Sequence, residues 1–255
     1  VFQALGEELV GANSAAMLAR GHFPLLIKLL DAHQDLSVQV HPDDAYAAQH
    51  ETGELGKTEM WYVLHAEPGV ELIYGLRRGA TAESIRAAIT NQTLVEQLHR
   101  LPIAPGDFIP AGAVHALLAG AVVAEIQQNS DTTYRLYDWG RLGADGKPRP
   151  LHVERALAVM DMTLIEPSAA TPTLLQEEQG LYREALVTCD KFVVEKLTLV
   201  QGRSFAGRCA GETFEIWGCI EGSARLHWAG APLDLAAIRF CLLPAVLGDY
   251  TLEAE

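Results

Sequence analysis

The sequence predicts a mainly β protein with helical insertions between its strands. Most apolar segments are short, rich in β-branched residues and followed by turn residues, as in SVQVHPDD at residues 37–44. The segment KFVVEKLTLV at residues 191–200 alternates apolar and polar side chains with the period of a half-buried strand. A helical period dominates only in separate stretches, so helices are expected as additions to a β framework.

In chain order, residues 5–20 have a helical pattern and LLIKLL at residues 25–30 begins the first strand. A helical insertion is expected at residues 79–101, where Ile85, Ala88 and Ile89 share a face. Within it, Thr93 and Glu96 have the spacing of a capping box, which predicts the start of a second helix. Another short helix is expected between His152 and Met160.

A second domain is predicted after a linker. Residues 166–180 are expected to be that linker, because Pro167, Pro172 and an acidic run interrupt any periodicity. β patterning resumes at Phe192, with short strands separated by Gly and Pro, which indicates a small β-barrel or sandwich. The predicted domains are therefore residues 1–165 and 166–255.

Composition limits the function classes. A chain of 255 residues with 49% apolar and 20% charged residues can bury a substantial core and is globular. Its formal charge of −14 argues against nucleic acid or an anionic membrane as the main partner. No apolar run reaches membrane-spanning length and no signal peptide is recognisable, so a cytoplasmic location is expected.

The cysteines are expected to be reduced core residues. All of them lie in the C-terminal third and none forms a CxxC pair, so they are poor candidates for zinc ligands: Cys189, Cys209, Cys219 and Cys241.

Potential metal ligands fall in separate β-rich segments: Gln39 and His41 in the first, Glu59 in the second and His115 in the third. Because successive strand side chains point to opposite faces, Gln39 and His41 can share one face. Imidazole nitrogens and a carboxylate suit Zn²⁺ and related ions, and three protein ligands with an open position characterise a catalytic site. A single strand histidine is more often just a hydrogen-bonded side chain, so the inference depends on the set.

The surroundings of these ligands extend the prediction. Lys57 lies two residues before Glu59, so on a regular strand both side chains face the same cavity. Gly106 and Asp107 predict a tight turn, followed by a short strand and a second turn at residues 110–112 that delivers His115. This stretch resembles the second motif of the cupin superfamily.

The segments QVHPDD, GKTEMWY and EIQQNSDTTYRLYDWGR, in this order, resemble type I mannose-6-phosphate isomerases in their shorter bacterial form. The resemblance is strong from about residue 24 to 155, whereas residues 166–255 match only in general character. It implies two cupin-like jelly-roll β-barrels with helical insertions, of which only the first binds metal. In that family an N-terminal portion precedes this point, so a preceding segment that contributes to the pocket or its cover is expected.

The resemblance also implies roles for individual residues. His41, Glu59 and His115 would bind one zinc ion per chain, with Gln39 as a possible further ligand and another divalent metal as an alternative. Arg135 would be catalytic, and Lys57 and Glu125 would line the pocket. The proton-transfer base stays open among Glu125, Lys57 and a metal-bound water. Alternatively, Lys57 and Arg135 are surface ion-pair partners and Glu125 only satisfies a buried donor.

The implied activity is the interconversion of mannose 6-phosphate and fructose 6-phosphate. Moving a carbonyl between C1 and C2 removes a carbon-bound proton and forms an enediolate, whose charge a divalent ion stabilises. Arg135 keeps its proton at working pH, so it can stabilise negative charge, the favoured role, or bind phosphate. Two alternatives are an iron-dependent cupin oxygenase and a non-catalytic sugar-binding or regulatory cupin.

Overall fold

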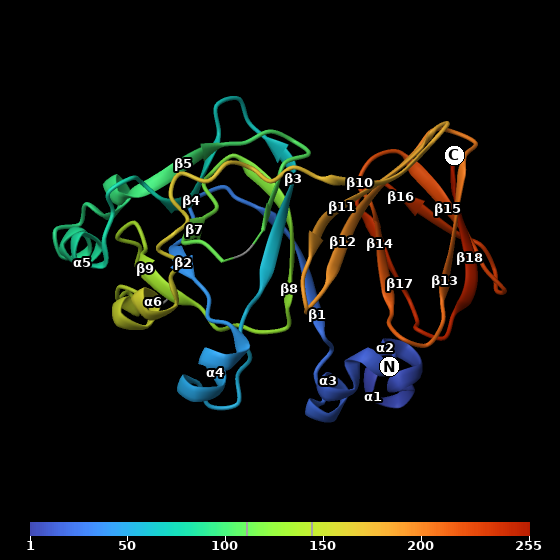
Figure 1. The fold of residues 1–255 in the computed structure, drawn as a ribbon, viewed down its shortest axis with the longest axis horizontal. Coiled ribbons are helices and arrows are strands. Elements are labelled where there is room, and N and C mark those ends of the chain that lie inside the picture. The colour runs from blue at the N-terminus through green and yellow to red at the C-terminus, as the bar shows by residue number, and fades with distance from the viewer. Residues whose placement is uncertain (111, 144) are drawn as a thin grey trace. The chain divides into compact units, whose positions relative to one another are not determined.

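The computed structural model describes residues 1–110, 112–143 and 145–255. Backbone packing divides this part of the chain into two compact units, one of residues 25–171 and one of residues 1–24 with 172–255. Antiparallel strands are the main regular elements of both units (Figure 1). The predicted mainly β class is confirmed.

The unit of residues 25–171 contains two sheets on opposite sides of its interior (Figure 1). The first sheet has the order β1-β8-β3-β6, with bounds Leu25–Asp31, Ala121–Gln128, Glu59–Ala66 and Phe108–Pro110. The second has the order β5-β4-β7-β2-β9, with bounds Leu98–Pro102, Glu71–Leu76, His115–Ala116, Val38–Val40 and Tyr134–Tyr137.

Alternation along these strands sorts side chains into two apolar clusters. Trp61 of β3 and Leu72 of β4 belong to the cluster between the sheets. Val38, Val40 and other side chains on the opposite face of the second sheet pack with residues of α5 (Ala82–Thr90) and α6 (Val153–Val159). Gln39, between Val38 and Val40, therefore faces the interior. The predicted first strand and the helix near residues 152–160 are confirmed.

Helix starts explain one success and one error of the prediction. α4 (Asp44–His50) begins where the Asp43 side chain accepts the Tyr46 N–H at 2.7 Å. The capping box of the predicted insertion lies at Thr81 and Ser84, where α5 begins. The capping box expected at Thr93 is wrong: only a 3₁₀ turn, η2 (Leu94–Gln97), follows without a side-chain cap. The 3₁₀ turn does not continue into a helix, because the next residues form β5, which pairs with β4.

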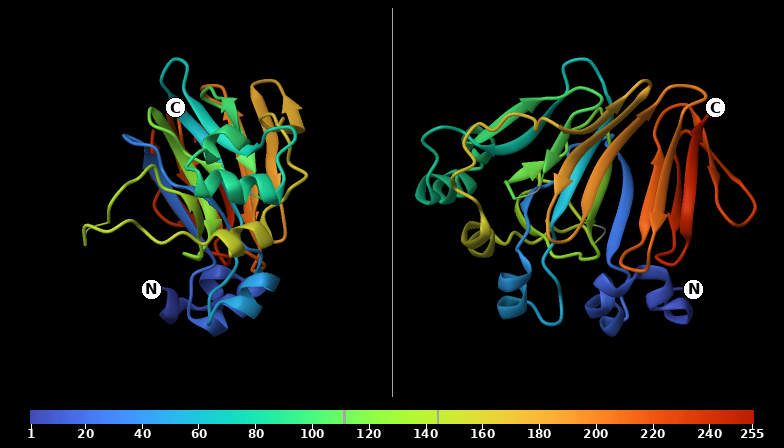
Figure 2. Two further views of the ribbon diagram at one scale, coloured as in Figure 1. Left: turned by 90° about the vertical axis from the view of Figure 1, so that its left-hand side faces the viewer. Right: turned by 45° about the vertical axis from the view of Figure 1, so that its right-hand side comes forward.

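The second unit also consists of antiparallel sheets (Figure 2). A three-stranded sheet has the order β10-β11-β12, with bounds Thr173–Glu178, Leu181–Thr188 and Val193–Leu199. A four-stranded sheet has the order β13-β18-β15-β16, with bounds Ser204–Cys209, Gly248–Ala254, Ser223–His227 and Leu233–Ala236. A separate ribbon pairs β14 (Glu215–Cys219) with β17 (Arg239–Leu243).

One expectation for this unit is corrected and another is met. The predicted linker contains strand β10, which pairs with β11, so β structure begins well before Phe192. A bulge between Leu174 and Gln176 disturbs the alternation that would have revealed the strand. All four cysteines are free, and Cys209 is buried in the apolar core.

The single helix expected at residues 5–20 is broken into short pieces: α1 (Phe2–Leu5), α2 (Glu7–Val10), η1 (Ala12–Ser14) and α3 (Ala15–Arg20). Gly6 and Gly11, with φ of 51° and 82°, separate the first pieces. A Cβ on Gly11 would lie 2.4 Å from the Glu212 carbonyl oxygen, and Ala12 N–H donates to the Gly211 carbonyl at 3.1 Å. These contacts group residues 1–24 with the C-terminal strands.

The finer predictions about architecture stay predictions. The paired strands of the described residues form open sheets rather than barrels closed by hydrogen bonds. The compact units change over at residues 171 and 172, beside the predicted domain boundary at 165 and 166. The expected turn at residues 110–112 includes Ala111, which lies outside the described residues.

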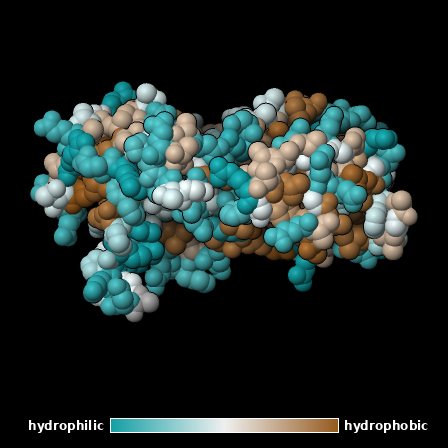
Figure 3. Space-filling model, turned by 90° about the horizontal axis from the view of Figure 1, so that it is seen from below, coloured by the Kyte–Doolittle hydropathy of each residue, from teal (hydrophilic) through white to brown (hydrophobic). Residues whose placement is uncertain are grey.

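Within the described ranges, no helix has the length and apolar character of a membrane span. Figure 3 shows one face of the molecule, where hydrophilic residues are interspersed with apolar ones. Such a mixed surface is usual for a folded protein, because polar residues cannot cover all of it.

Candidate metal centre

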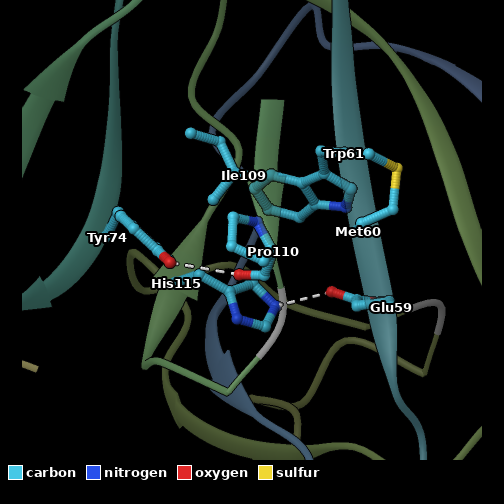
Figure 4. Close-up of a pocket in the computed structure, with 7 residues that line it drawn as sticks. All are labelled: Glu59, Met60, Trp61, Tyr74, Ile109, Pro110 and His115. Atoms are coloured by element: carbon cyan, nitrogen blue, oxygen red, sulfur yellow. Dashed lines mark hydrogen bonds and ion pairs between the residues drawn. The ribbon is translucent and has the colours of Figure 1, made fainter. Parts of the chain in front are cut away.

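His41, Glu59 and His115 meet inside the unit of residues 25–171. Their ligand atoms all lie within 4.8 Å of one another. Glu59 Oε1 is 3.0 Å from His115 Nε2 and 3.4 Å from His41 Nε2. Figure 4 shows Glu59 and His115 pointing toward each other from β3 and from β7. The three side chains are buried, with at most 7% of their surface exposed.

Strand register explains why residues distant in sequence converge here. Strand β2 lies between β7 and β9, and Gln39 is the register partner of both His115 and Arg135. Directly opposed residues in antiparallel strands project to the same face. Gln39, His115 and Arg135 therefore form a row across the inner face of the second sheet, and Glu59 approaches from the first.

Both histidines are oriented by backbone carbonyls. His41 Nδ1 lies 2.8 Å from the Thr132 oxygen and His115 Nδ1 lies 2.9 Å from the Ala113 oxygen. Because a carbonyl oxygen only accepts hydrogen bonds, each Nδ1 carries the proton and each Nε2 keeps its lone pair. Those lone pairs are turned toward Glu59, and hydrogen bonding of the far ring nitrogen is typical of metal-binding histidines.

The protonation states in this cluster suit a cation. Burial lowers the pKa of His41, against the opposing charge of Glu59. Burial would raise the pKa of Glu59, but the adjacent imidazoles of His41 and His115 outweigh burial and hold that pKa well below its usual value. His41 is thus neutral and Glu59 ionised at neutral pH. These are the forms that a divalent ion binds.

The second oxygen of Glu59 faces Lys57. Lys57 Nζ forms an ion pair with Oε2 at 2.6 Å, and Oε2 has no hydrogen-bond partner among the described residues. The contact is an ion pair that brings the two side chains together.

Gln39 lies against both imidazoles. Its Nε2 is 3.5 Å from His41 Nε2 and 3.4 Å from His115 Nε2, and its Oε1 accepts the Ser37 hydroxyl at 3.2 Å. Turning the amide by half a rotation would direct Oε1 at the same space. The side chain can therefore offer either a donor to the imidazoles or a neutral oxygen ligand.

A second buried carboxylate lies beside this cluster. Glu125 Oε1 accepts from Lys28 Nζ at 3.0 Å and lies 3.8 Å from Lys57 Nζ, while Oε2 accepts the Trp61 indole N–H at 2.9 Å. Lys28 also donates to Gln127 Oε1 at 2.6 Å. Sequence reasoning missed Lys28. Its signal is a charged residue inside the apolar run LLIKLL, because buried lysines need a partner.

Arg135 lies beyond Gln39 on β9. Its Nη1 donates to the Pro150 carbonyl at 3.3 Å, whereas its buried Nε has no acceptor among the described residues. Burial and the charges of Arg149 and Arg141 lower the pKa of Arg135, against the influence of Asp138. Such a guanidinium still carries its charge at neutral pH and has a donor available for a ligand.

A small hollow opens at the cluster, and Figure 4 shows the side chains around it. Its lining combines two metal-ligand candidates with apolar walls: Glu59, Met60, Trp61, Tyr74, Ile109, Pro110 and His115. The Trp61 ring meets the His115 ring edge-on, with centroids 5.0 Å apart. Apolar walls reduce the local dielectric constant and so strengthen charge interactions within the hollow.

Comparison with known proteins agrees with the resemblance seen in the sequence. Residues 3–68 match the family described as phosphomannose isomerase type I, catalytic domain. The probable mannose-6-phosphate isomerase GmuF of Bacillus subtilis (strain 168) is 41% identical over 233 residues, which cover 91% of this chain and 72% of GmuF. Mannose-6-phosphate isomerase ManA of the same strain is 41% identical over 235 residues, with the same coverage.

The likeness extends to three dimensions. The crystal structure of mannose 6-phosphate isomerase from Bacillus subtilis matches this chain with a TM-score of 0.81 and 36% sequence identity. The match covers 91% of this chain and 73% of that one.

Proposed function

The chain belongs to the type I mannose-6-phosphate isomerase family, and on this premise we propose that it interconverts mannose 6-phosphate and fructose 6-phosphate. The observation that carries the proposal is the buried meeting of His41, Glu59 and His115 beside Lys57. The substrate is a phosphorylated hexose.

His41, Glu59 and His115 hold one divalent ion per chain in this proposal, and Gln39 provides a fourth, neutral ligand. Two backbone-oriented imidazoles with free Nε2 atoms and one ionised carboxylate fit such an ion. Zinc is favoured, because two nitrogen donors and a carboxylate with an open position form a common catalytic zinc set. When bound, the ion supplies Lewis-acid polarisation of the sugar carbonyl.

The proton moves through the chain's own residues in this proposal. Lys57 Nζ and Glu125 Oε1 are 3.8 Å apart, so a small shift brings them into hydrogen-bond contact and lets them exchange a proton. Lys28 and Trp61 hold the Glu125 carboxylate in one orientation. In this proposal the pair Lys57 and Glu125 carries the proton between C1 and C2.

Arg135 stabilises the negative charge that develops on the enediolate oxygens. Its guanidinium is permanently charged, and its buried Nε has no partner within the described chain. A fixed donor in a site with low dielectric constant is worth more than the same donor in water.

We extend the proposal to the fold of the family. The two opposed sheets of residues 25–171 support a cupin-like barrel, and the sheets after residue 172 support a second one without a metal site. The oxygenase and the non-catalytic alternatives are not favoured, because the relatives are named as isomerases.

The test is conversion of mannose 6-phosphate to fructose 6-phosphate by purified protein after chelation and after zinc is restored. The chelated protein is the control, and Glu59→Gln is the matched variant of nearly equal shape. Turnover that requires metal and is lost in Glu59→Gln supports the proposal. Zinc binding without any ketose product contradicts it.

A further inference from the structure

Arg135 is held by residues 150–152, which lie outside the metal cluster. Strand β9 is an edge strand of its sheet, with β2 on one side. On the other side, the N–H of Arg135 donates to His152 Nδ1 at 3.3 Å, and the His152 N–H donates to the Arg135 carbonyl at 2.8 Å. The Pro150 carbonyl accepts Arg135 Nη1 at 3.3 Å. Backbone and guanidinium are thus held from the same three-residue segment.

We propose that His152 is a positioning residue for Arg135, with its imidazole replacing the backbone carbonyl that a neighbouring strand would offer to the Arg135 N–H. The proposal rests on the proposed function for the role of Arg135. It goes beyond that function by assigning a task to a residue 17 positions away that is absent from the metal cluster.

The position of His152 is itself well determined. It is the N-cap residue of α6, whose Ala156 is fully buried against the second sheet. Because that packing fixes the start of the helix, the imidazole cannot drift along β9. A displacement of about 1 Å in a charge-stabilising group can cost about a hundredfold in rate. Holding Arg135 at both its backbone and its guanidinium therefore bears directly on turnover.

We call the contacts of His152 and Pro150 with Arg135 the clamp. It requires one protonation state of the His152 ring. With its Nδ1 accepting the Arg135 N–H, the neutral ring must carry its proton on Nε2. A second proton would turn Nδ1 into a donor that faces another donor. The groups around the ring are the cations Arg135 and Arg155, the carboxylate of Glu51 and the ring of Tyr134, 6.1 Å away.

These surroundings favour the working form. Burial lowers the pKa of His152, as do the charges of Arg135 and Arg155, against the opposing influence of Glu51. The neutral ring therefore persists below the usual histidine pKa of 6.5. The clamp is intact at neutral pH and is lost as the pH falls through the lowered pKa.

The decisive comparison is between His152→Leu and His152→Asn in the full, zinc-loaded chain. Leucine removes the acceptor, whereas asparagine can place Oδ1 near the position of Nδ1 and suits a helix N-cap. We expect kcat to fall by about ten- to a hundredfold in His152→Leu and to recover to within about threefold in His152→Asn. His33→Leu, an exposed histidine replaced in the same way, should behave as wild type.

Two further readouts separate positioning from general loss of structure. Zinc content and melting temperature should be alike in the wild type and in His152→Asn. In the wild type, kcat should fall at acid pH while zinc is still bound. This fall should be missing from the pH profile of His152→Asn, since asparagine does not titrate. Exchange of the Arg135 amide hydrogen with deuterium should be faster in His152→Leu than in the wild type or His152→Asn.

The outcomes distinguish this inference from the proposed function. If the wild type is active and the kcat of His152→Leu is within twofold of it, the clamp alone is overturned. Equal loss of kcat in both His152 variants overturns it as well. If His152→Leu fails to fold, His152→Asn tests the clamp instead. Its kcat should then lie within about threefold of wild type and should lack the fall at acid pH. If the wild type does not isomerise the sugar, the proposed function fails, and unchanged Arg135 amide exchange in His152→Leu then overturns the clamp as well.

Discussion

A polar cluster of the C-terminal strands and the cluster of His41, Glu59 and His115 differ in how their hydrogen bonds are matched. In the C-terminal strands, Glu215 Oε2 accepts from Trp217 Nε1 at 2.9 Å and from the Tyr250 hydroxyl at 2.5 Å. Burial and the hydrogen bond to Glu215 raise the pKa of Tyr250, so this donor keeps its proton. Donors and acceptors in this cluster are paired within the protein.

The cluster of His41, Glu59 and His115 lacks that balance. Two imidazole lone pairs and a carboxylate oxygen point at the same space, and Glu59 Oε2 has no directed donor in the described chain. Buried acceptors that face one another are costly unless a cation or donor joins them. The comparison teaches that mismatch, rather than burial of polar groups as such, marks the site that needs a ligand.

The largest effect is expected from Glu59→Gln. The change removes the only charged ligand while preserving shape, so metal content should fall and turnover should drop by about a thousandfold or more. Metal analysis and a coupled assay for fructose 6-phosphate measure both. A variant that retains zinc and full activity would show that the acceptor cluster is merely structural.

Arg135→Ala should separate charge stabilisation from metal binding. We expect zinc content to stay at the wild-type level while kcat falls about a hundredfold, the typical cost of losing one fixed donor to a developing oxyanion. Steady-state kinetics with parallel metal analysis measure this, and Arg135→Lys tests whether charge alone suffices. Loss of zinc in Arg135→Ala would place the residue in the metal site instead.

Glu215→Leu tests the matched cluster. Without the carboxylate, the Tyr250 hydroxyl loses its acceptor and the Trp217 indole keeps only the Tyr250 oxygen, at 3.2 Å, so the free energy of unfolding should fall by about 2 kcal/mol. Zinc content and turnover at 25 °C should not change. Urea unfolding measures the difference, and Glu215→Gln, which keeps an acceptor oxygen, is the control. An effect on activity larger than that on stability would contradict the structural role of this cluster.

The smallest effect is expected at Asp138, a buried carboxylate that pairs with the partly exposed Arg141 and Arg149. Burial would raise the pKa of Asp138, but hydrogen bonds from Arg149 and Arg141 outweigh it and lower that pKa below 3.8. The ionised form therefore stabilises the fold above pH 3.8, and this contribution disappears as the pH falls through the lowered value.

Asp138→Asn should accordingly cost about 1 kcal/mol at pH 7, a modest value because the arginine partners are partly exposed. The difference from wild type should shrink when unfolding by urea is repeated near pH 3. A difference that is equal at both pH values would mean that the pair acts through packing rather than through charge.

Much of the metal centre could be predicted because its signals are local. His41 and Gln39 lie in one strand segment, and Lys57 precedes Glu59 by two residues, so strand alternation alone predicts their shared faces. The helical period expected at residues 79–101 likewise predicted helix α5, which occupies residues 82–90. By contrast, the bulge in β10 hid a strand inside the predicted linker, because register depends on the partner strand.

By itself, the sequence determined the β class, the candidate metal ligands and the family, since these depend on alternation, residue chemistry and long motifs in order. Only the tertiary structure decided which donors meet which acceptors. Lys28 reaches Glu125 across 97 positions, and His152 reaches Arg135 through the edge of a sheet. Such pairings arise from strand order and helix packing. The chemistry of a side chain determines which bonds it can form, whereas the fold determines which partner lies within reach.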